Sequence, residues 1–321
     1  DNWVLDCVGF LPGKRESRRY VGDHTLSQRD VEAEGKHFED IVAYGGWTMD
    51  DHFPEGFYRK EAGTIWHPAP SPYGIPYRSL YSAGVENLLC AGRNISATHT
   101  ALASTRVMGT CSIIGQAVGT AAAVALRHGT TPRGVYRSHL DELRQDLMEA
   151  DCYLPFTRRE MSPLTARATL SGPSDDVEVL RNGHDRPIGD DDNGYHCPLD
   201  SAIEYTFDRP EEVATARLVF DSDLTDERAG HMPSYYELGP DQEGTPRVDP
   251  IPKTMTRSYR VETRDEKGMW SVFAETGDNV QRLNTVQLGR RVTGVRYVPT
   301  ATFGAEASHL FAFDLFADGG S

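Results

Sequence analysis

The stretch NLLCAGRNISATHT, residues 87–100, is the part of the sequence that decides the fold. Its apolar run ends in Ala-Gly-Arg, and a short polar loop follows. Residues 104–121, STRVMGTCSIIGQAVGTA, then begin a helix that is rich in small side chains. A strand, a loop and a helix N-terminus in this order direct backbone N–H groups and the positive end of the helix dipole at an anionic ligand. The stretch therefore predicts half of a cofactor site.

The flanking segments indicate further helices and strands. Ser27 and Asp30 have capping-box spacing, which predicts a helix from there to about Ala43. We expect a long loop over residues 47–74 and strands at residues 74–80 and 86–91. The main helix is expected from about Thr105 to His128, with Gly129 as the stop signal. A second helix is expected after Pro132, with one apolar stripe made of Val135, Leu140, Leu143 and Leu147.

The charge is acidic and unevenly placed. The chain of 321 residues carries a formal net charge of −15, and residues 171–250 alone hold 20 Asp and Glu against 6 Arg. Because nucleic acids bind basic surfaces, we expect no nucleic-acid partner. No uninterrupted apolar run approaches the ~20 residues that span a bilayer, so we expect no membrane partner and a cytoplasmic location.

The cysteines and the acidic turns argue against a metal site. The five cysteines are widely spaced and lack a CxxC pair, which disfavours a zinc site or a disulfide framework. We expect buried free thiols at Cys90 and Cys111. The turn at residues 189–194 offers oxygen ligands suited to Ca²⁺, but its spacing does not match an EF-hand loop. A solvated acidic turn is favoured, and we expect no metal ligands.

The C-terminal half alternates apolar and polar residues in short segments separated by turns. These segments lie at residues 203–207, 216–220, 258–263, 292–298 and 310–316. Such period-two alternation predicts a β-sandwich. The pattern also resembles the galactose-binding-like jelly rolls. The change of character and three prolines, Pro155, Pro163 and Pro173, predict a linker at residues 161–174.

The N-terminal half carries several ordered motifs. They read GRNISATH at residues 92–99, RVMGT at 106–110 and GQAVGTAA at 115–122, together with RESRR at 15–19, GGWTMD at 45–50 and IPYR at 75–78. In this order they resemble the C-terminal flavin segment of bacterial FAD-dependent oxidoreductases, a group related to fumarate reductase. The resemblance implies an α/β flavoprotein portion over residues 1–160, an incomplete Rossmann-like FAD domain with a substrate domain. The alternation described above predicts that an all-β sandwich or jelly roll follows over residues 175–321.

Proteins of this group bind the pyrophosphate of FAD with a Gly-x-Gly-x-x-Gly strand–helix turn, and the sequence has no such motif. We therefore expect that half on a second polypeptide or on an N-terminal segment. The resemblance implies that Arg106, Val107, Met108 and Gly109 open the helix beneath the flavin ring. It also implies that Gly92 lets the backbone approach FAD and that Arg93 faces its ribityl or phosphate groups. Gly109, Gly115 and Gly119 are expected to let the helix pack closely.

Flavin-dependent oxidation of an alcohol needs a base for the hydroxyl proton, and histidine suits that role near neutral pH. His99 follows the Gly92 turn, and His52 stands beside the acidic pair Asp50 and Asp51. Both are candidate catalytic residues, with a structural or surface role as the alternative for each. His24 and His67 are weaker candidates.

Two further sets complete the predicted site. Tyr77 and Arg78 are candidate substrate ligands, with an ordinary strand end as the alternative. The basic cluster at residues 15–19 is a candidate for binding flavin phosphates or an anionic substrate, against a solvated turn. The predicted function is removal of hydride from an alcohol carbon of a small molecule to FAD, with a sugar or glycoside as one candidate substrate. The alternative is a non-catalytic carbohydrate-binding or assembly subunit that keeps a remnant of the flavin fold.

Overall fold

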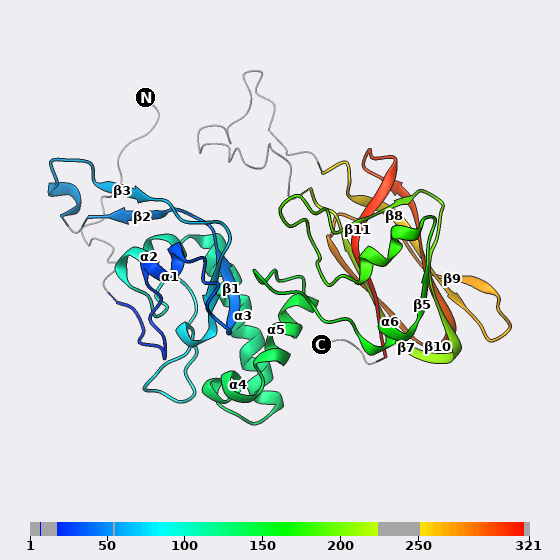
Figure 1. Ribbon diagram of the computed structural model, residues 1–321, viewed down its shortest axis with the longest axis horizontal. Helices are drawn as coiled ribbons and strands as arrows, with labels where there is room; N and C mark the ends of the chain where they lie inside the picture. Colours follow the sequence, from blue (N-terminus) through cyan, green and yellow to red (C-terminus); the bar gives the residue numbers. More distant parts are fainter. Residues whose placement is uncertain (1–6, 8–17, 54, 224–250, 318–321) are drawn as a thin grey trace, which may run out of the picture. The chain divides into compact units, whose positions relative to one another are not determined.

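The computed structural model describes residue 7 and residues 18–53, 55–223 and 251–317. The chain divides into two compact units, Asp1–Thr157 and Arg158–Ser321 (Figure 1). Each unit contains its own hydrophobic core. The span predicted as a linker, residues 161–174, is part of the second unit. Its helix α6 (Pro163–Arg167) buries Leu164, and the Thr165 hydroxyl accepts a hydrogen bond from the backbone N of Leu315 at 2.7 Å.

The first unit combines two small antiparallel sheets with helices. The pair β1–β4 forms one sheet and the pair β2–β3 the other, while α3 packs on β1 and α5, and α2 packs on β2. Its elements are α1 (Gln28–Glu32), β1 (Ile41–Gly45), β2 (Met49–His52), η1 (Gly56–Tyr58), β3 (Thr64–His67), β4 (Tyr73–Pro76), η2 (Tyr77–Ser79), α2 (His99–Thr105), α3 (Met108–Arg127), α4 (Pro132–Ser138) and α5 (Leu140–Glu149).

The helix predicted over residues 27–43 is wrong beyond its first turns. The capping box is present, since Ser27 N donates to Asp30 Oδ2 at 2.8 Å and Asp30 N donates to Ser27 Oγ. However, Glu34 and Gly35 adopt left-handed φ angles of 60° and 64°, which end the helix. The chain then enters β1, whose side chains are almost all buried, as expected of a strand that lies under helix α3.

Three other predictions for this region are corrected. The loop predicted over residues 47–74 contains the β2–β3 hairpin and the first half of β4, and the strand predicted at 74–80 turns into the 3₁₀ helix η2 after Pro76. The strand predicted at 86–91 is reduced to one isolated bridge between Tyr81 and Leu89. Polar residues dominate β2 and β3, so the alternation that identifies a strand is missing from the sequence there.

The prediction of the main helices is confirmed. Helix α3 ends at Arg127, and Gly129 follows in the left-handed conformation at φ 58°. The stripe Val135, Leu143 and Leu147 is fully buried, although His139 separates α4 from α5. In the described part of the chain, α3 is long and apolar enough to cross a membrane by length and composition, a test that core helices of soluble proteins also pass. One third of its tested window is buried.

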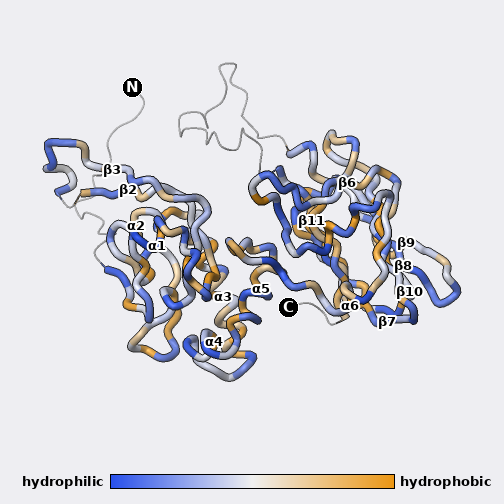
Figure 2. The backbone as a smooth tube through the Cα atoms, viewed as in Figure 1, coloured by the Kyte–Doolittle hydropathy of each residue, from blue (hydrophilic) through white to orange (hydrophobic). Residues whose placement is uncertain are grey.

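The second unit is a β-sandwich, as predicted. Its seven-stranded antiparallel sheet has the order β6-β11-β7-β10-β8-β9, with β5 paired to β7. The elements are β5 (Thr169–Ser171), η3 (Asp175–Arg181), β6 (Tyr195–Pro198), β7 (Ile203–Phe220), β8 (Thr256–Arg264), β9 (Trp270–Thr276), β10 (Leu283–Thr302) and β11 (Ala307–Phe316). The hydropathy of these segments and of the largely hydrophilic β2–β3 loop can be followed in Figure 2.

Two long strands hold the sandwich together. The pairing of β7 with β10 shifts register between Gln287 and Arg290 and again between Val292 and Gly294. Because such irregularities bend a strand pair, the two ends of this ribbon contribute to both layers around the core. The core contains aromatic rings that contact one another at tilted angles, among them Tyr205, Phe220, Tyr297 and Phe313.

A buried ion-pair network closes one side of this core. Arg217 contacts Asp185 at 2.7 Å and Asp314 at 3.3 Å, and Arg159 contacts Asp314 at 2.8 Å and Asp185 at 3.3 Å. Asp314 is fully buried, and both arginine side chains are at most 4% exposed. Two guanidinium groups and two carboxylates therefore balance each other in the interior.

Candidate functional site

Strand β2 gathers the residues that the sequence identifies as candidate bases. Its Asp50 and His52 lie two residues apart and so face the same side, while Asp51 faces the other. Helix α2 packs on this strand and brings His99 to Asp51. The two predicted catalytic histidines thus each lie beside one carboxylate of the acidic pair.

His99 is held through one ring nitrogen. It is the first residue of α2, which Thr98 caps through its hydroxyl oxygen. Its Nε2 lies 2.7 Å from Asp51 Oδ1, and the side chain is 40% exposed. Within the described residues its Nδ1 makes no hydrogen bond. A carboxylate this close to one imidazole nitrogen stabilises the positive charge that forms when the other nitrogen takes a proton.

His52 is engaged through both ring nitrogens. Nε2 lies 3.2 Å from Asp50 Oδ2, and Nδ1 lies 2.8 Å from the hydroxyl oxygen of Thr64 on β3. The ring therefore ties the two strands of the hairpin together. Of the two predicted bases, His99 is the one whose geometry leaves a nitrogen for a substrate.

Arg106 is turned toward β2. Its Nη2 donates to the main-chain oxygen of Asp50 at 3.0 Å and to Asp50 Oδ2 at 3.1 Å. The residue follows α2 and precedes α3, so this contact fixes the junction between the two helices. Around the junction, three buried polar atoms have no hydrogen-bond partner among the described residues: Thr48 Oγ1, Asp50 Oδ1 and Thr105 Oγ1. Such atoms are expected to meet a polar ligand or water.

The N-terminus of α3 is open. Val107 takes the N-cap position with extended backbone angles and supplies no side-chain hydrogen bond. Met108 is 83% exposed, and a Cβ added at Gly109 would meet no atom within 4 Å. The first backbone N–H groups of a 20-residue helix are therefore accessible, together with the positive end of its dipole.

The turn with Gly92 lies close to this helix end. Gly92 has a φ of 87°, a conformation that disfavours any residue with a side chain. Arg93 is exposed and near enough to Cys111, in the first turns of α3, for its charge to act against the burial that raises the pKa of that thiol. The predicted cofactor residues at 92–93 and 106–109 thus come together at one end of α3.

Tyr77 and Arg78 have structural contacts instead of the predicted contact with substrate. Tyr77 has no exposed surface, and its hydroxyl donates to the carbonyl oxygen of Pro132 at 3.1 Å. Arg78 donates through Nε and Nη2 to the fully buried carboxylate of Asp40 at 3.0 and 2.9 Å. The alternative, an ordinary strand end, is the one that the structure supports.

The remaining candidates are placed as follows. Residues 15–17 of the basic cluster lie outside the described residues, but Tyr20 N donates to Asn94 O at 2.9 Å, so the segment after the cluster runs beside the Gly92 turn. His24 contacts Asp30, and His67 pairs with Met49 across the β2–β3 hairpin. All five cysteines are free; Cys90 is buried as predicted and Cys111 is half-buried.

The glycines of α3 do not pack closely within this chain. A Cβ built at Gly109, Gly115 or Gly119 meets nothing within 4 Å. The predicted close packing of the helix is therefore not made by the described residues. These positions form an uncovered face of small residues on α3.

Comparison with known families agrees with the geometry of this site. Residues 2–147 match the family model described as FAD dependent oxidoreductase. Over these residues the first unit is similar to FAD-dependent oxidoreductases, and the family match indicates FAD as its cofactor. We call it the flavoprotein unit. The uncapped helix end and the two buried hydroxyl groups of Thr48 and Thr105 fit a large anionic cofactor. No curated protein matches the chain.

Solved structures of carbohydrate-binding modules resemble about half of the chain. The family 32 module from Streptococcus pneumoniae EndoD is 14% identical, with 47% of this chain and 96% of that one covered and a TM-score of 0.32. The family 32 module of C. perfringens NanJ in complex with galactose is 9% identical, with 48% and 97% covered and a TM-score of 0.33. A Streptococcus pneumoniae fucose binding module is 11% identical, with 50% and 100% covered and a TM-score of 0.34.

The sequence did not predict which residue each carboxylate of the acidic pair contacts. It placed Asp50 and Asp51 beside His52, whereas Asp51 serves His99 and Asp50 serves both His52 and Arg106. The alternation of side chains along a strand would separate the two carboxylates. This alternation could not be applied, because residues 47–74 were predicted to form a loop.

Proposed function

We propose that the flavoprotein unit takes part in the removal of hydride from an alcohol carbon of a small molecule, with His99 as the base. When bound, FAD supplies the hydride acceptor. The observation that carries the proposal is the contact of Asp51 with Nε2 of His99, a side chain that is 40% exposed. A hydroxyl proton must leave as the carbon loses hydride, and His99 Nδ1 is the acceptor.

The residues around the start of α3 have distinct roles in this proposal. The backbone N–H groups of residues 108–110 bind the anionic side of the cofactor, in line with the missing side-chain cap at Val107. Arg106 holds β2 against the helix junction, so it acts on the position of Asp50 and His52. Gly92 lets the backbone turn without a side chain in the way.

We further propose that a second polypeptide or an additional segment with the Gly-rich half completes the site. Two features of the described residues support this. The small-residue face of α3 has nothing packed within 4 Å of its glycines, and each sheet of the flavoprotein unit has only two strands. Two-stranded sheets are marginal alone and are normally extended or covered.

An absorbance spectrum of the native protein with all its chains tests the proposal. Bound FAD gives a band near ~450 nm, and anaerobic addition of an oxidisable alcohol should bleach it when His99 is present. Glycosides and simple secondary alcohols are compared in this assay, since the sugar substrate is a prediction. A colourless complex that fails to take up added FAD would favour the non-catalytic subunit instead.

A further inference from the structure

Two histidines of the second unit form a cross-strand pair on neighbouring strands. His196 on β6 lies directly opposite His309 on β11 in the antiparallel register. Their rings stack with centroids 4.0 Å apart and planes within 7° of parallel. Asp192, in the acidic turn before β6, approaches both rings: its Oδ2 lies 3.2 Å from His196 Nε2 and its Oδ1 lies 3.1 Å from His309 Nε2.

His309 is buried and oriented by a second carboxylate. The side chain is 7% exposed, and its Nδ1 lies 3.0 Å from Asp221 Oδ2. Because a carboxylate accepts a hydrogen bond, Nδ1 carries the proton, and the neutral ring presents a lone pair at Nε2. A carboxylate behind a histidine in this way is the usual support of a metal-binding imidazole.

The Nε2 atom of His309 has no hydrogen-bond partner in the described part of the chain. It is buried, and the nearby Asp192 carboxylate lacks hydrogen-bond geometry. A lone pair that faces a carboxylate at 3.1 Å is repelled by it unless a cation lies between them. Gly194 leaves the space that this nitrogen occupies, because a Cβ at that position would lie 2.0 Å from Nε2.

We propose that Asp192, His196 and His309 bind a Zn²⁺ ion. Their three ligand atoms lie within 4.8 Å of one another. Two imidazoles and a carboxylate form a donor set that zinc takes, and a fourth position stays open to water. His309 is the fixed ligand, while His196, 59% exposed, turns its ring out of the stack to direct Nε2 at the ion. The ion would fasten the acidic turn to the β6–β11 edge of the sandwich.

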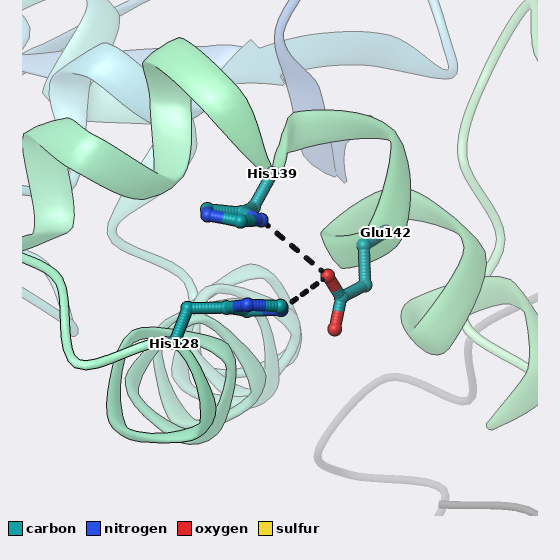
Figure 3. Close-up of side chains that lie close together, drawn as sticks. All are labelled: His128, His139 and Glu142. Atoms are coloured by element: carbon teal, nitrogen blue, oxygen red, sulfur yellow. Dashed lines mark hydrogen bonds and ion pairs between the residues drawn. The ribbon is translucent and has the colours of Figure 1, made fainter.

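The flavoprotein unit contains a second group of this kind, which serves as an internal comparison. His128 and His139 both approach one carboxylate oxygen of Glu142 (Figure 3). There, Arg127 donates to the other oxygen of Glu142 and already balances its charge. All three side chains are at least 24% exposed, and neither histidine has a buried carboxylate behind it. The same residue types are thus present without the buried, unsatisfied nitrogen.

Isothermal titration of the metal-stripped full chain with Zn²⁺ tests the proposal. One Zn²⁺ per chain should bind, and His196→Ala should abolish that binding, because only two ligands remain. His139→Ala is the matched control and should bind as the unmodified chain does. Asp221→Asn, which keeps an acceptor for Nδ1 but loses the charge, should weaken binding by about 10–100-fold.

Thermal unfolding separates loss of the ion from loss of the fold. Zn²⁺ should raise the Tm of the unmodified chain and of His139→Ala, while His196→Ala should match the metal-stripped protein and show no response. The proposal is overturned if the unmodified chain binds no Zn²⁺. It is also overturned if His139→Ala loses the ion and His196→Ala keeps it.

Discussion

Asp51 Oδ1 lies 2.7 Å from Nε2 of His99, so a residue of the β2–β3 hairpin fixes the first side chain of helix α2. We expect His99→Ala to slow flavin reduction by substrate about 10²–10⁴-fold, the usual contribution of a positioned base. Stopped-flow absorbance of the FAD-loaded complex measures this rate. Asp51→Asn should produce a smaller loss, because the ring keeps a partner but not the charged one.

His52→Ala is the matched test of the other predicted base. Both nitrogens of His52 are occupied by Asp50 and Thr64, so its removal should loosen the hairpin and leave most of the rate of flavin reduction intact. Equal losses in His52→Ala and His99→Ala would contradict the assignment of the base to His99.

Gly92 and Gly119 are expected to respond in opposite directions to alanine. At φ 87°, Gly92→Ala should lower the free energy of unfolding by about 1–2 kcal/mol. Gly119 lies inside α3 with nothing within 4 Å of a new Cβ, so Gly119→Ala should raise it by about 1 kcal/mol in the isolated chain. Denaturant unfolding measures both. If the completing half packs on this face, Gly119→Ala should also weaken assembly, which analytical ultracentrifugation would detect.

The ion-pair network of the sandwich gives a stability prediction with a built-in control. Arg217→Met leaves the buried Asp314 and Asp185 with too little positive charge and should cost about 3–5 kcal/mol of unfolding free energy. Arg209→Met removes an 82% exposed partner of Glu211 and should cost about 0–1 kcal/mol. A similar cost for the two variants, by urea unfolding, would argue against the network as a stabilising element.

The pair Asp23 and Arg133 gives a pH prediction for the flavoprotein unit. The hydrogen bond from Arg133 lowers the pKa of Asp23, against the effect of burial. A carboxyl whose pKa is lower in the folded state stabilises the fold above its unfolded pKa, and this stabilisation is lost as the pH falls through the folded pKa. A double-mutant cycle of Asp23→Asn and Arg133→Gln should therefore show a coupling energy at neutral pH that disappears in acid. Coupling that persists at low pH would contradict this.

The sequence predicted those parts of the fold whose signals are local. The end of α3, the Ser27–Asp30 capping box and the strands of the sandwich follow from glycines, caps and periodicity. The helix predicted to Ala43 failed because the left-handed turn at Glu34 and Gly35 depends on packing against Gly74, whose carbonyl lies 2.4 Å from the position of a Cβ on Gly35. The hairpin that contains Asp50 and Asp51 was not predicted, because polar residues dominate its strands.

The sequence predicted which residues are candidates for the site, but not which residues they contact. Arg93 of the Gly92 turn lies near the first turns of α3, and His99 begins α2 and contacts Asp51. Tyr77 turned out to be a core side chain, since its burial depends on the later helix that contains Pro132. The pairing of His196 with His309 could not be predicted, because only the sheet order brings β6 next to β11.

The position of β11 sets the order in which the second unit can be completed. In the sheet, β11 lies between β6 and β7. The strand β6 therefore cannot join the rest of the sheet until β11, one of the last described segments, is inserted between them. Pairing over such sequence distances is slow to form. Until β11 pairs, β6 therefore has no partner strand among the described residues, and its backbone N–H and C=O groups are open to non-native pairing during folding.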